Sequence, residues 1–131
     1  ACVGARLHLV EPMGFRLTEK NLKRAGCDYW DDVEVVRWPC VWGFSAAHGD
    51  GERTRVTGQA ACGYGEAVYG PDAFLLFGRE SRGLDQAISD ARADRCRRIP
   101  MREGARSLNL SNAVAIAAYE ALAQQGFPGL V

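Results

Sequence analysis

The chain has 131 residues, 47% of them hydrophobic and 24% charged, which suits one globular domain with an apolar core. Sixteen Lys and Arg residues balance sixteen Asp and Glu residues, so no overall positive field draws the chain toward nucleic acid or a membrane. A polyanionic partner would need a local patch of basic side chains. No apolar run reaches the ~20 residues of a membrane span. Because no charged n-region followed by an apolar h-region opens the given sequence, we expect no signal peptide.

The cysteines and histidines form no metal-binding motif. The cysteines are Cys2, Cys27, Cys40, Cys62 and Cys96. They are odd in number, lie far apart and include no Cys-x-x-Cys pair, and only His8 and His48 could complete a site. We therefore expect no metal, and free thiols in a reducing cytoplasm.

The first third of the chain predicts short strands and one helix. The predicted elements are a strand over Arg6–Val10, a helix over Glu19–Ala25 capped by Thr18, and strands over Val33–Trp38 and Val41–Ser45. Only Pro39 and Cys40 separate the last two strands, whereas a parallel crossover needs a dozen or more residues. Either the two strands form an unusual hairpin, or residues are absent here.

The remainder alternates strands with helices. Glycine-rich Ala46–Gly65 predicts a long mobile loop. The later elements are a buried strand over Ala73–Phe77, a helix over Asp85–Ala93, a short strand over Cys96–Met101 and a helix over Asn109–Gln125. This order predicts a single α/β domain over residues 1–131, with a mainly parallel sheet and helices on both faces.

Three predicted strands end in loops that could bind a ligand. These loops follow Val10, Phe77 and Ile99, and ligands of open parallel sheets bind at the carboxyl ends of strands. We expect the three loops to converge on one crevice. In the second loop, Gly78 either admits a ligand close to the backbone or only permits a tight turn.

Small polar residues surround the start of the last helix. Ser107, Asn109, Ser111 and Asn112 stand there, where unpaired N–H groups need acceptors. Capping accounts for one of them, and the others fit a loop that addresses a ligand. No Ser-His-acid or Cys-His arrangement is assignable, because His8 suits a hydrogen-bonded core position and His48 falls in the mobile loop.

Arginines concentrate near the same predicted crevice. They are Arg82, Arg92, Arg95, Arg97, Arg98, Arg102 and Arg106. A solvated charged face is one interpretation. The restriction to arginine favours the other interpretation, phosphate contacts through guanidinium groups.

Five motifs, in order along the chain, resemble the SPOUT superfamily, and within it the small tRNA 2′-O-methyltransferases of the wobble nucleotide. They are Leu9-Val10-Glu11-Pro12-Met13-Gly14-Phe15, Arg24-Ala25-Gly26-Cys27-Asp28-Tyr29, Phe77-Gly78-Arg79-Glu80-Ser81-Arg82-Gly83-Leu84, Arg98-Ile99-Pro100-Met101 and Ser107-Leu108-Asn109-Leu110-Ser111-Asn112-Ala113-Val114. The resemblance implies a C-terminal trefoil knot, a homodimer, a tRNA substrate and S-adenosylmethionine as cofactor.

The resemblance also implies roles for individual residues. The implied cofactor-binding residues are Phe44, Gly78, Ile99, Met101, Ser107 and Leu108. Asn109 would help to arrange the reacting centre, and Glu80, Arg82 and Arg102 would contact the RNA. For the dimer, the small side chains of Ala113, Ala117 and Ala121 would allow close helix approach.

Two features of the family have no predicted counterpart. Its first strand, with an Asn-x-Gly-Asn-x-x-Arg motif that helps to activate the ribose hydroxyl, is not found in this sequence. Its helix between the strands predicted at Val33–Trp38 and Val41–Ser45 is also not found, so we expect both segments to be missing.

The sequence therefore leaves two candidate functions. The first is a tRNA ribose 2′-O-methyltransferase. The second is a catalytically incomplete RNA-binding or dimerisation module that keeps the knot and cofactor pocket, which the missing arginine motif favours. A methyltransferase acting on a base is disfavoured by the Ser-Leu-Asn-Leu-Ser-Asn pattern.

Overall fold

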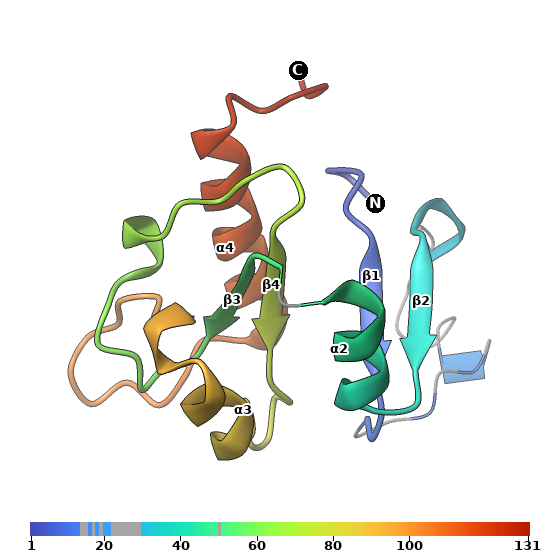
Figure 1. Cartoon of the computed structure of the whole chain (residues 1–131). Coiled ribbons are helices and arrows are strands. Elements are labelled where there is room, and N and C mark those ends of the chain that lie inside the picture. The colour runs from blue at the N-terminus through green and yellow to red at the C-terminus, as the bar shows by residue number, and fades with distance from the viewer. Residues whose placement is uncertain (14–15, 17, 19, 22–29, 50) are drawn as a thin grey trace. The chain divides into compact units, whose positions relative to one another are not determined.

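A computed structural model describes residues 1–13, 16, 18, 20–21, 30–49 and 51–131 (Figure 1). The chain divides into two compact units, Ala1–Gly49 and Asp50–Val131, and each is described by itself. Each unit has its own parallel sheet. Within the described ranges, no helix is both long enough and apolar enough to span a bilayer.

The first unit is built on two parallel strands. Strand β1 covers Leu7–Val10 and pairs in parallel with β2, which covers Val35–Trp38. Both strands were predicted. The predicted helix at 19–25 lies almost wholly outside the described residues, although Thr18 Oγ1 accepts the backbone N–H of Asn21 at 3.2 Å, as a helix cap would.

The predicted strand over Val41–Ser45 is wrong, because these residues begin helix α2 (Val41–His48). Its β-branched and aromatic residues favour a strand when taken alone. In the helix, Phe44 and His48 are four residues apart and share one face, which packs against His8 and Trp38. Pro39 and Cys40 thus lead from a strand into a helix, and the segment thought to be missing here is α2 itself.

The second unit contains a three-stranded parallel sheet in the order β4-β3-β5. The strands are β3 (Arg53–Val56), β4 (Phe74–Phe77) and β5 (Cys96–Arg97), and the helices are α3 (Gln86–Ala91) and α4 (Leu110–Gln124). The predicted strand at 73–77 and both predicted helices are confirmed. The strand expected over 96–101 is present but shorter.

The prediction of a mobile loop over Ala46–Gly65 is wrong, since this stretch holds the central strand β3. The two residues of this strand that are buried in the second unit are Arg53 and Arg55, which are only 6% and 7% exposed. Arginine is rarely buried so fully, so the pattern of apolar residues does not reveal the strand.

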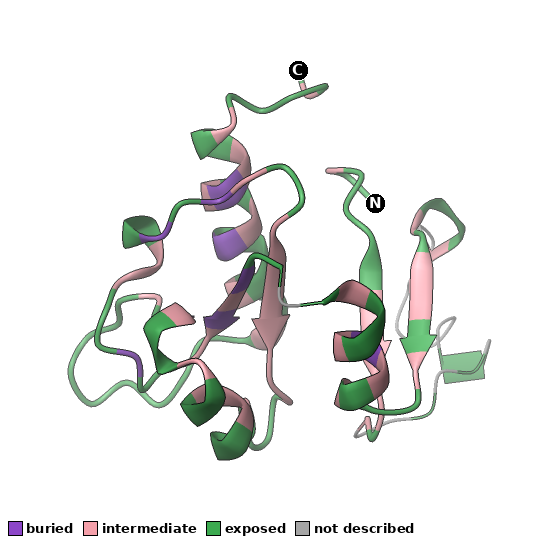
Figure 2. Ribbon diagram, viewed as in Figure 1, coloured by how far each residue is buried: buried purple, intermediate pink, exposed green. Residues whose placement is uncertain are grey.

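Helices α3 and α4 cover opposite faces of this sheet. Leu75 packs against Ala121 of α4 in the buried core with Ala67 and Tyr69. Arg55 pairs with Leu76, the neighbour of Leu75, and therefore points to the other face, where its Nε donates to the Ile88 carbonyl of α3 at 2.9 Å. Figure 2 shows the buried segments of α4 and β3.

The prediction that the alanine face of α4 forms a dimer contact is wrong, because other residues of the same chain cover this face. Ala117 is completely buried. Ala121 is 8% exposed and packs in one core cluster with Ala67 and Tyr69. Small side chains at these positions allow α4 to approach its own sheet. A partner subunit would have to use another face of α4.

Candidate functional site: a cavity at the carboxyl ends of β3 and β4

A cavity of about 220 Å³ opens in the second unit where β3 and β4 end. The lining residues are Val56, Thr57, Gly58, Phe77, Gly78, Arg79, Glu80, Gly83, Leu84, Ile99, Met101, Arg106, Ser107, Leu108, Leu110 and Ala113. They come from the ends of two strands, the loops after them, the loop before α4 and the first turn of α4. This is the edge where parallel sheets bind ligands.

The structure brings together most of the residues that the sequence assigned to a cofactor. Gly78, Ile99, Met101, Ser107 and Leu108 all line the cavity, as does Glu80, which was assigned to the RNA. The loops after Phe77 and Ile99 therefore meet, as expected.

The other predicted site residues lie elsewhere. Arg82 and Arg102 are exposed and lie outside the described lining, as does Asn109. Phe44 is buried within the first unit, and the loop after Val10 also belongs to that unit. The roles of these residues, and the convergence of that loop, stay predictions.

The Gly78–Leu84 loop closes on itself at one side of the cavity. Arg79 and Gly83 exchange backbone hydrogen bonds of 3.1 and 2.7 Å, and Gly83 adopts a left-handed φ of 71°. A side chain at Gly78 would place its Cβ 1.8 Å from the backbone carbon of Gly83. The fold itself thus requires glycine here, so a substitution at Gly78 tests folding before it tests ligand binding.

Asn109 caps α4 beside the cavity. Its Oδ1 accepts the backbone N–H groups of Ser111 at 2.9 Å and Asn112 at 3.4 Å, and the Ser111 hydroxyl at 2.5 Å. Of the four polar residues considered from sequence, Asn109 is therefore the cap. Ser107 is left to line the cavity.

Sequence reasoning missed the part of the lining that follows β3. The sequence pattern predicts a loop in place of β3 and gives no site role to Val56, Thr57 and Gly58, which line the cavity. The sequence does carry one signal of this strand: the β-branched residues Thr54 and Val56 alternate with arginines, and Gly58 follows them. The backbone N–H of Thr57 donates to the Arg97 carbonyl at 2.9 Å, so this segment is fixed against β5.

The histidines lie in the first unit and not in this cavity. His8 is half-buried, and its Nδ1 accepts the indole N–H of Trp38 at 3.0 Å, so the expected hydrogen bond is present although the residue is not fully in the core. His48 ends α2, so its predicted place in a mobile loop is wrong. Among the described residues, no three His, Cys, Asp or Glu side chains are grouped to hold a metal, and Cys2, Cys40, Cys62 and Cys96 are free thiols.

Comparison with known proteins settles the family. The model of the SpoU rRNA Methylase family matches residues 1–119. The chain belongs to this family. It is 41% identical over 132 residues to the tRNA (cytidine(34)-2′-O)-methyltransferase of Escherichia coli K12, a match that covers all of this chain and 84% of that enzyme.

Two solved structures agree with the fold. A structure from a study of 2-OH methylation of C/U34 on tRNA superposes with a TM-score of 0.82 at 39% identity, covering 94% of this chain and 80% of its own. A Bacillus anthracis structure gives a TM-score of 0.91 at 39% identity, covering 98% and 83%. The α/β fold with parallel sheets, and the resemblance noted from sequence, are thus confirmed.

Proposed function

We propose that this SpoU family member methylates the ribose 2′-hydroxyl of the tRNA wobble nucleotide, with S-adenosylmethionine as methyl donor. The observation that carries the proposal is that three separate motifs line one cavity: the Gly78 loop, Ile99 with Met101, and Ser107 with Leu108. The Escherichia coli relative named for this reaction is 41% identical along the whole chain, which supports the same chemistry here.

The cavity lining fits part of such a cofactor. Ile99, Met101 and Leu108 offer apolar surface for a purine, and Gly58 and Gly78 leave the backbone accessible to polar groups. The volume of about 220 Å³ is below the ~300–1,000 Å³ of pockets that enclose whole drug-sized ligands. We therefore assign these residues to the adenosine portion.

When bound, S-adenosylmethionine supplies a methyl group on a sulfonium, an already activated donor. The protein then has to align the ribose hydroxyl and assist loss of its proton, and needs no nucleophilic side chain. We assign Asn109, at the start of α4, to the arrangement of the reacting centre. Glu80 on the cavity wall and the exposed Arg82 and Arg102 would contact the RNA.

The family also suggests a domain organisation, a knot and an oligomeric state for this chain. We propose that residues 1–131 act as one methyltransferase domain, because the family model spans both units. We further propose a C-terminal trefoil knot, a homodimer, and Phe44 as an additional cofactor contact. We also propose that the protein acts in the cytoplasm, which a tRNA substrate supports.

Transfer of labelled methyl groups tests the reaction. The protein should label a tRNA that carries C or U at the wobble position, and should not label the same tRNA with a 2′-deoxyribose at that nucleotide. Binding of both tRNA and S-adenosylmethionine without transfer would instead support the incomplete binding module.

A pair of matched variants tests the cavity assignment. Met101→Ala should weaken S-adenosylmethionine binding roughly tenfold, since loss of ~1.4 kcal/mol of apolar contact corresponds to a factor of ten. Val68→Ala, at a valine that is 87% exposed and outside the lining, should bind as the parent protein does. Equal affinities for both variants in calorimetry would contradict the assignment.

A further inference from the structure

Two arginines, Arg79 and Arg106, line the cavity and are not used by the adenosine assignment. Arg79 lies two residues after the end of β4, and Arg106 precedes Ser107 in the loop before α4. The described lining holds one other charged side chain, that of Glu80. Two loops that are far apart in the sequence therefore each bring one cation to the same cavity.

The fold sets the backbone at both positions without using either guanidinium group. The backbone N–H of Arg79 donates to the Gly83 carbonyl at 3.1 Å, and the Gly83 N–H donates back at 2.7 Å. Arg106 follows a turn that the backbone N–H of Ala105 closes with a hydrogen bond of 3.1 Å. Neither arginine side chain forms a hydrogen bond or an ion pair with any residue that the structure describes.

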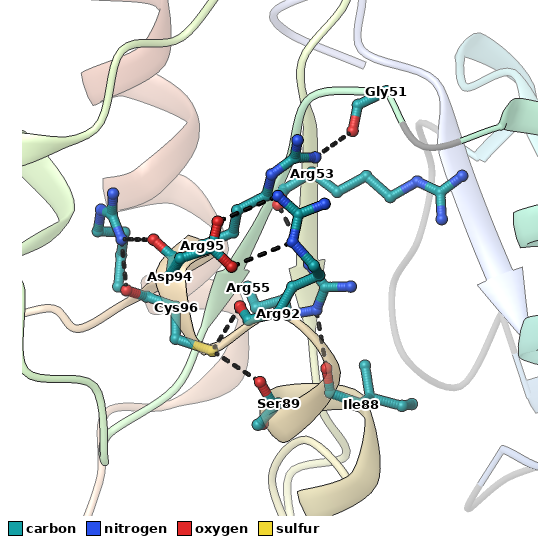
Figure 3. A network of polar contacts seen from close by, with 10 residues as sticks. Gly51, Arg53, Arg55, Ile88, Ser89, Arg92, Asp94, Arg95 and Cys96 are labelled. Carbon is teal, nitrogen blue, oxygen red and sulfur yellow. Dashed lines mark hydrogen bonds and ion pairs between the residues drawn. The ribbon is translucent and has the colours of Figure 1, made fainter.

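Other arginines of the second unit are engaged by the chain itself. Arg55, Arg92 and Arg95 each donate to an oxygen of the protein, at 2.9, 3.0 and 2.8 Å (Figure 3). These three residues lie outside the described cavity lining. Arg79 and Arg106 thus differ from them in two respects, since they line the cavity and their charges are left for a ligand.

The charge of the lining favours a bound anion. Two arginines and one glutamate leave the lining with an excess of one positive charge. S-adenosylmethionine does not compensate this excess, because its sulfonium and ammonium groups outnumber its one carboxylate. A phosphodiester of RNA does compensate it, because it brings a negative charge and no cation. Guanidinium groups also bind phosphate oxygens through paired hydrogen bonds.

The substrate of the proposed reaction carries a phosphate close to the reacting group. The 2′-hydroxyl is attached to C2′, and the adjacent C3′ carries the oxygen that leads to the next phosphate. A cofactor in the cavity therefore receives this phosphate nearby whenever it receives the hydroxyl. Arg79 is half-buried and Arg106 is exposed, so both side chains can meet a phosphate that arrives from solvent.

We propose that Arg79 and Arg106 hold the phosphate on the 3′ side of the reacting nucleotide and so position its 2′-hydroxyl for methyl transfer. The inference rests on the proposed function, because it takes tRNA as the substrate. The two side chains orient the substrate and take no proton from it. Fixing the phosphate fixes the ribose to which it is joined, which reduces the freedom that the hydroxyl loses before transfer.

A tRNA with one uncharged linkage tests the contact. A methylphosphonate replaces the phosphate on the 3′ side of the wobble nucleotide in an otherwise identical tRNA. The parent protein should bind the modified tRNA roughly tenfold more weakly, as expected for loss of a charge-assisted hydrogen bond. Arg79→Gln/Arg106→Gln should bind both tRNAs equally, because it lacks the groups that respond to this charge. The same linkage placed in the acceptor stem should affect both proteins alike.

The salt dependence of tRNA binding gives a second measurement. Arg79→Gln/Arg106→Gln should reduce the slope of log affinity against log salt by about 0.7, for one phosphate of single-stranded RNA. Arg79→Lys/Arg106→Lys keeps the charges and should retain most of the slope. As a matched control, Arg6→Gln/Arg37→Gln removes two arginines already paired with glutamates at 2.8 and 3.7 Å, and should keep the parent slope.

Three results would overturn the proposal. The first is an equal loss of affinity for the methylphosphonate tRNA in the parent protein and in Arg79→Gln/Arg106→Gln. The second is an equal salt slope for these two proteins. The third is a variant that binds S-adenosylhomocysteine more weakly but methylthioadenosine, which lacks the carboxylate, as the parent does, because the arginines would then hold the cofactor. Thermal unfolding of each variant identifies any loss of fold.

The inference and the proposed function fail separately. If the parent protein binds tRNA but methylates none, the proposed function is wrong, whereas the two linkages still decide whether the arginines hold the phosphate. If the parent methylates tRNA but binds both linkages equally, only the inference is wrong. A parent protein that binds no tRNA overturns both.

Discussion

At the scale of single residues, the hydrogen bond between Trp38 and His8 requires a neutral His8. Its Nδ1 accepts the indole N–H of Trp38, and its ring lies 5.2 Å from that of His48 and 5.4 Å from that of Phe44. Burial, then repulsion from His48 and Arg6, lowers the pKa of His8 below its ordinary 6.5, while Glu34 opposes the shift. Protonation of Nδ1 would also remove the acceptor that Trp38 uses.

This environment predicts that the protein loses stability in mild acid. Because the pKa is lower in the folded chain, the unfolded chain binds more protons as the pH falls through 6.5, and the free energy of unfolding decreases until His8 is protonated in both states. Urea unfolding between about pH 8 and about pH 5 measures this loss. His8→Asn keeps an acceptor but does not titrate, so its stability should depend less on pH. Identical pH profiles would contradict the assignment to His8.

At the scale of secondary structure, two elements that follow one another in the sequence show where local pattern fails. Helix α2 (Val41–His48) has strand-like composition, and strand β3 (Arg53–Val56) buries arginines. In both, tertiary packing overrides propensity: α2 forms because one face completes an aromatic cluster with His8 and Trp38, and β3 forms because apolar β4 pairs beside it. Strands with ordinary apolar patterns, such as β4, were predicted correctly.

Two substitutions can separate the capping of α4 by Asn109 from its proposed role at the reacting centre. Asn109→Ala removes the cap and should cost ~0.5–2 kcal/mol of unfolding free energy. Asn109→Asp keeps oxygen acceptors for the Ser111 and Asn112 N–H groups but loses the amide donors. We expect it to unfold like the parent protein in urea and to transfer methyl groups more slowly. Full activity of the aspartate variant would limit Asn109 to capping.

At the scale of the whole molecule, the cavity was more predictable than the surfaces around it. The Gly78, Ile99 and Ser107 segments carry recognisable motifs, so sequence alone pointed to their residues. Thr57 and Gly58 complete the lining but follow a strand that sequence pattern did not reveal. The alanines of α4 were assigned to a partner because spacing does not tell which side of an amphipathic helix its own sheet covers.

Burial indicates which side of α4 remains available to a second copy. Ala115, Ile116, Tyr119 and Ala123 are exposed on the side away from buried Ala117 and Ala121. Phe127 is also exposed, with its ring 6.3 Å from that of Tyr119. An exposed apolar surface of this kind is typical of an interaction site. We therefore expect the proposed homodimer to form through this face.

Charged substitutions on this face should produce monomers. In a symmetric dimer each substitution occurs twice, so Tyr119→Glu should remove about 3 kcal/mol of apolar burial and weaken association roughly a hundredfold. Val68→Glu adds the same charge at an exposed valine outside α4 and should leave the dimer intact. Light scattering at micromolar concentration distinguishes the two states. A monomeric parent protein would refute the dimer, whereas a dimeric Tyr119→Glu variant would show that the subunits meet on a different surface.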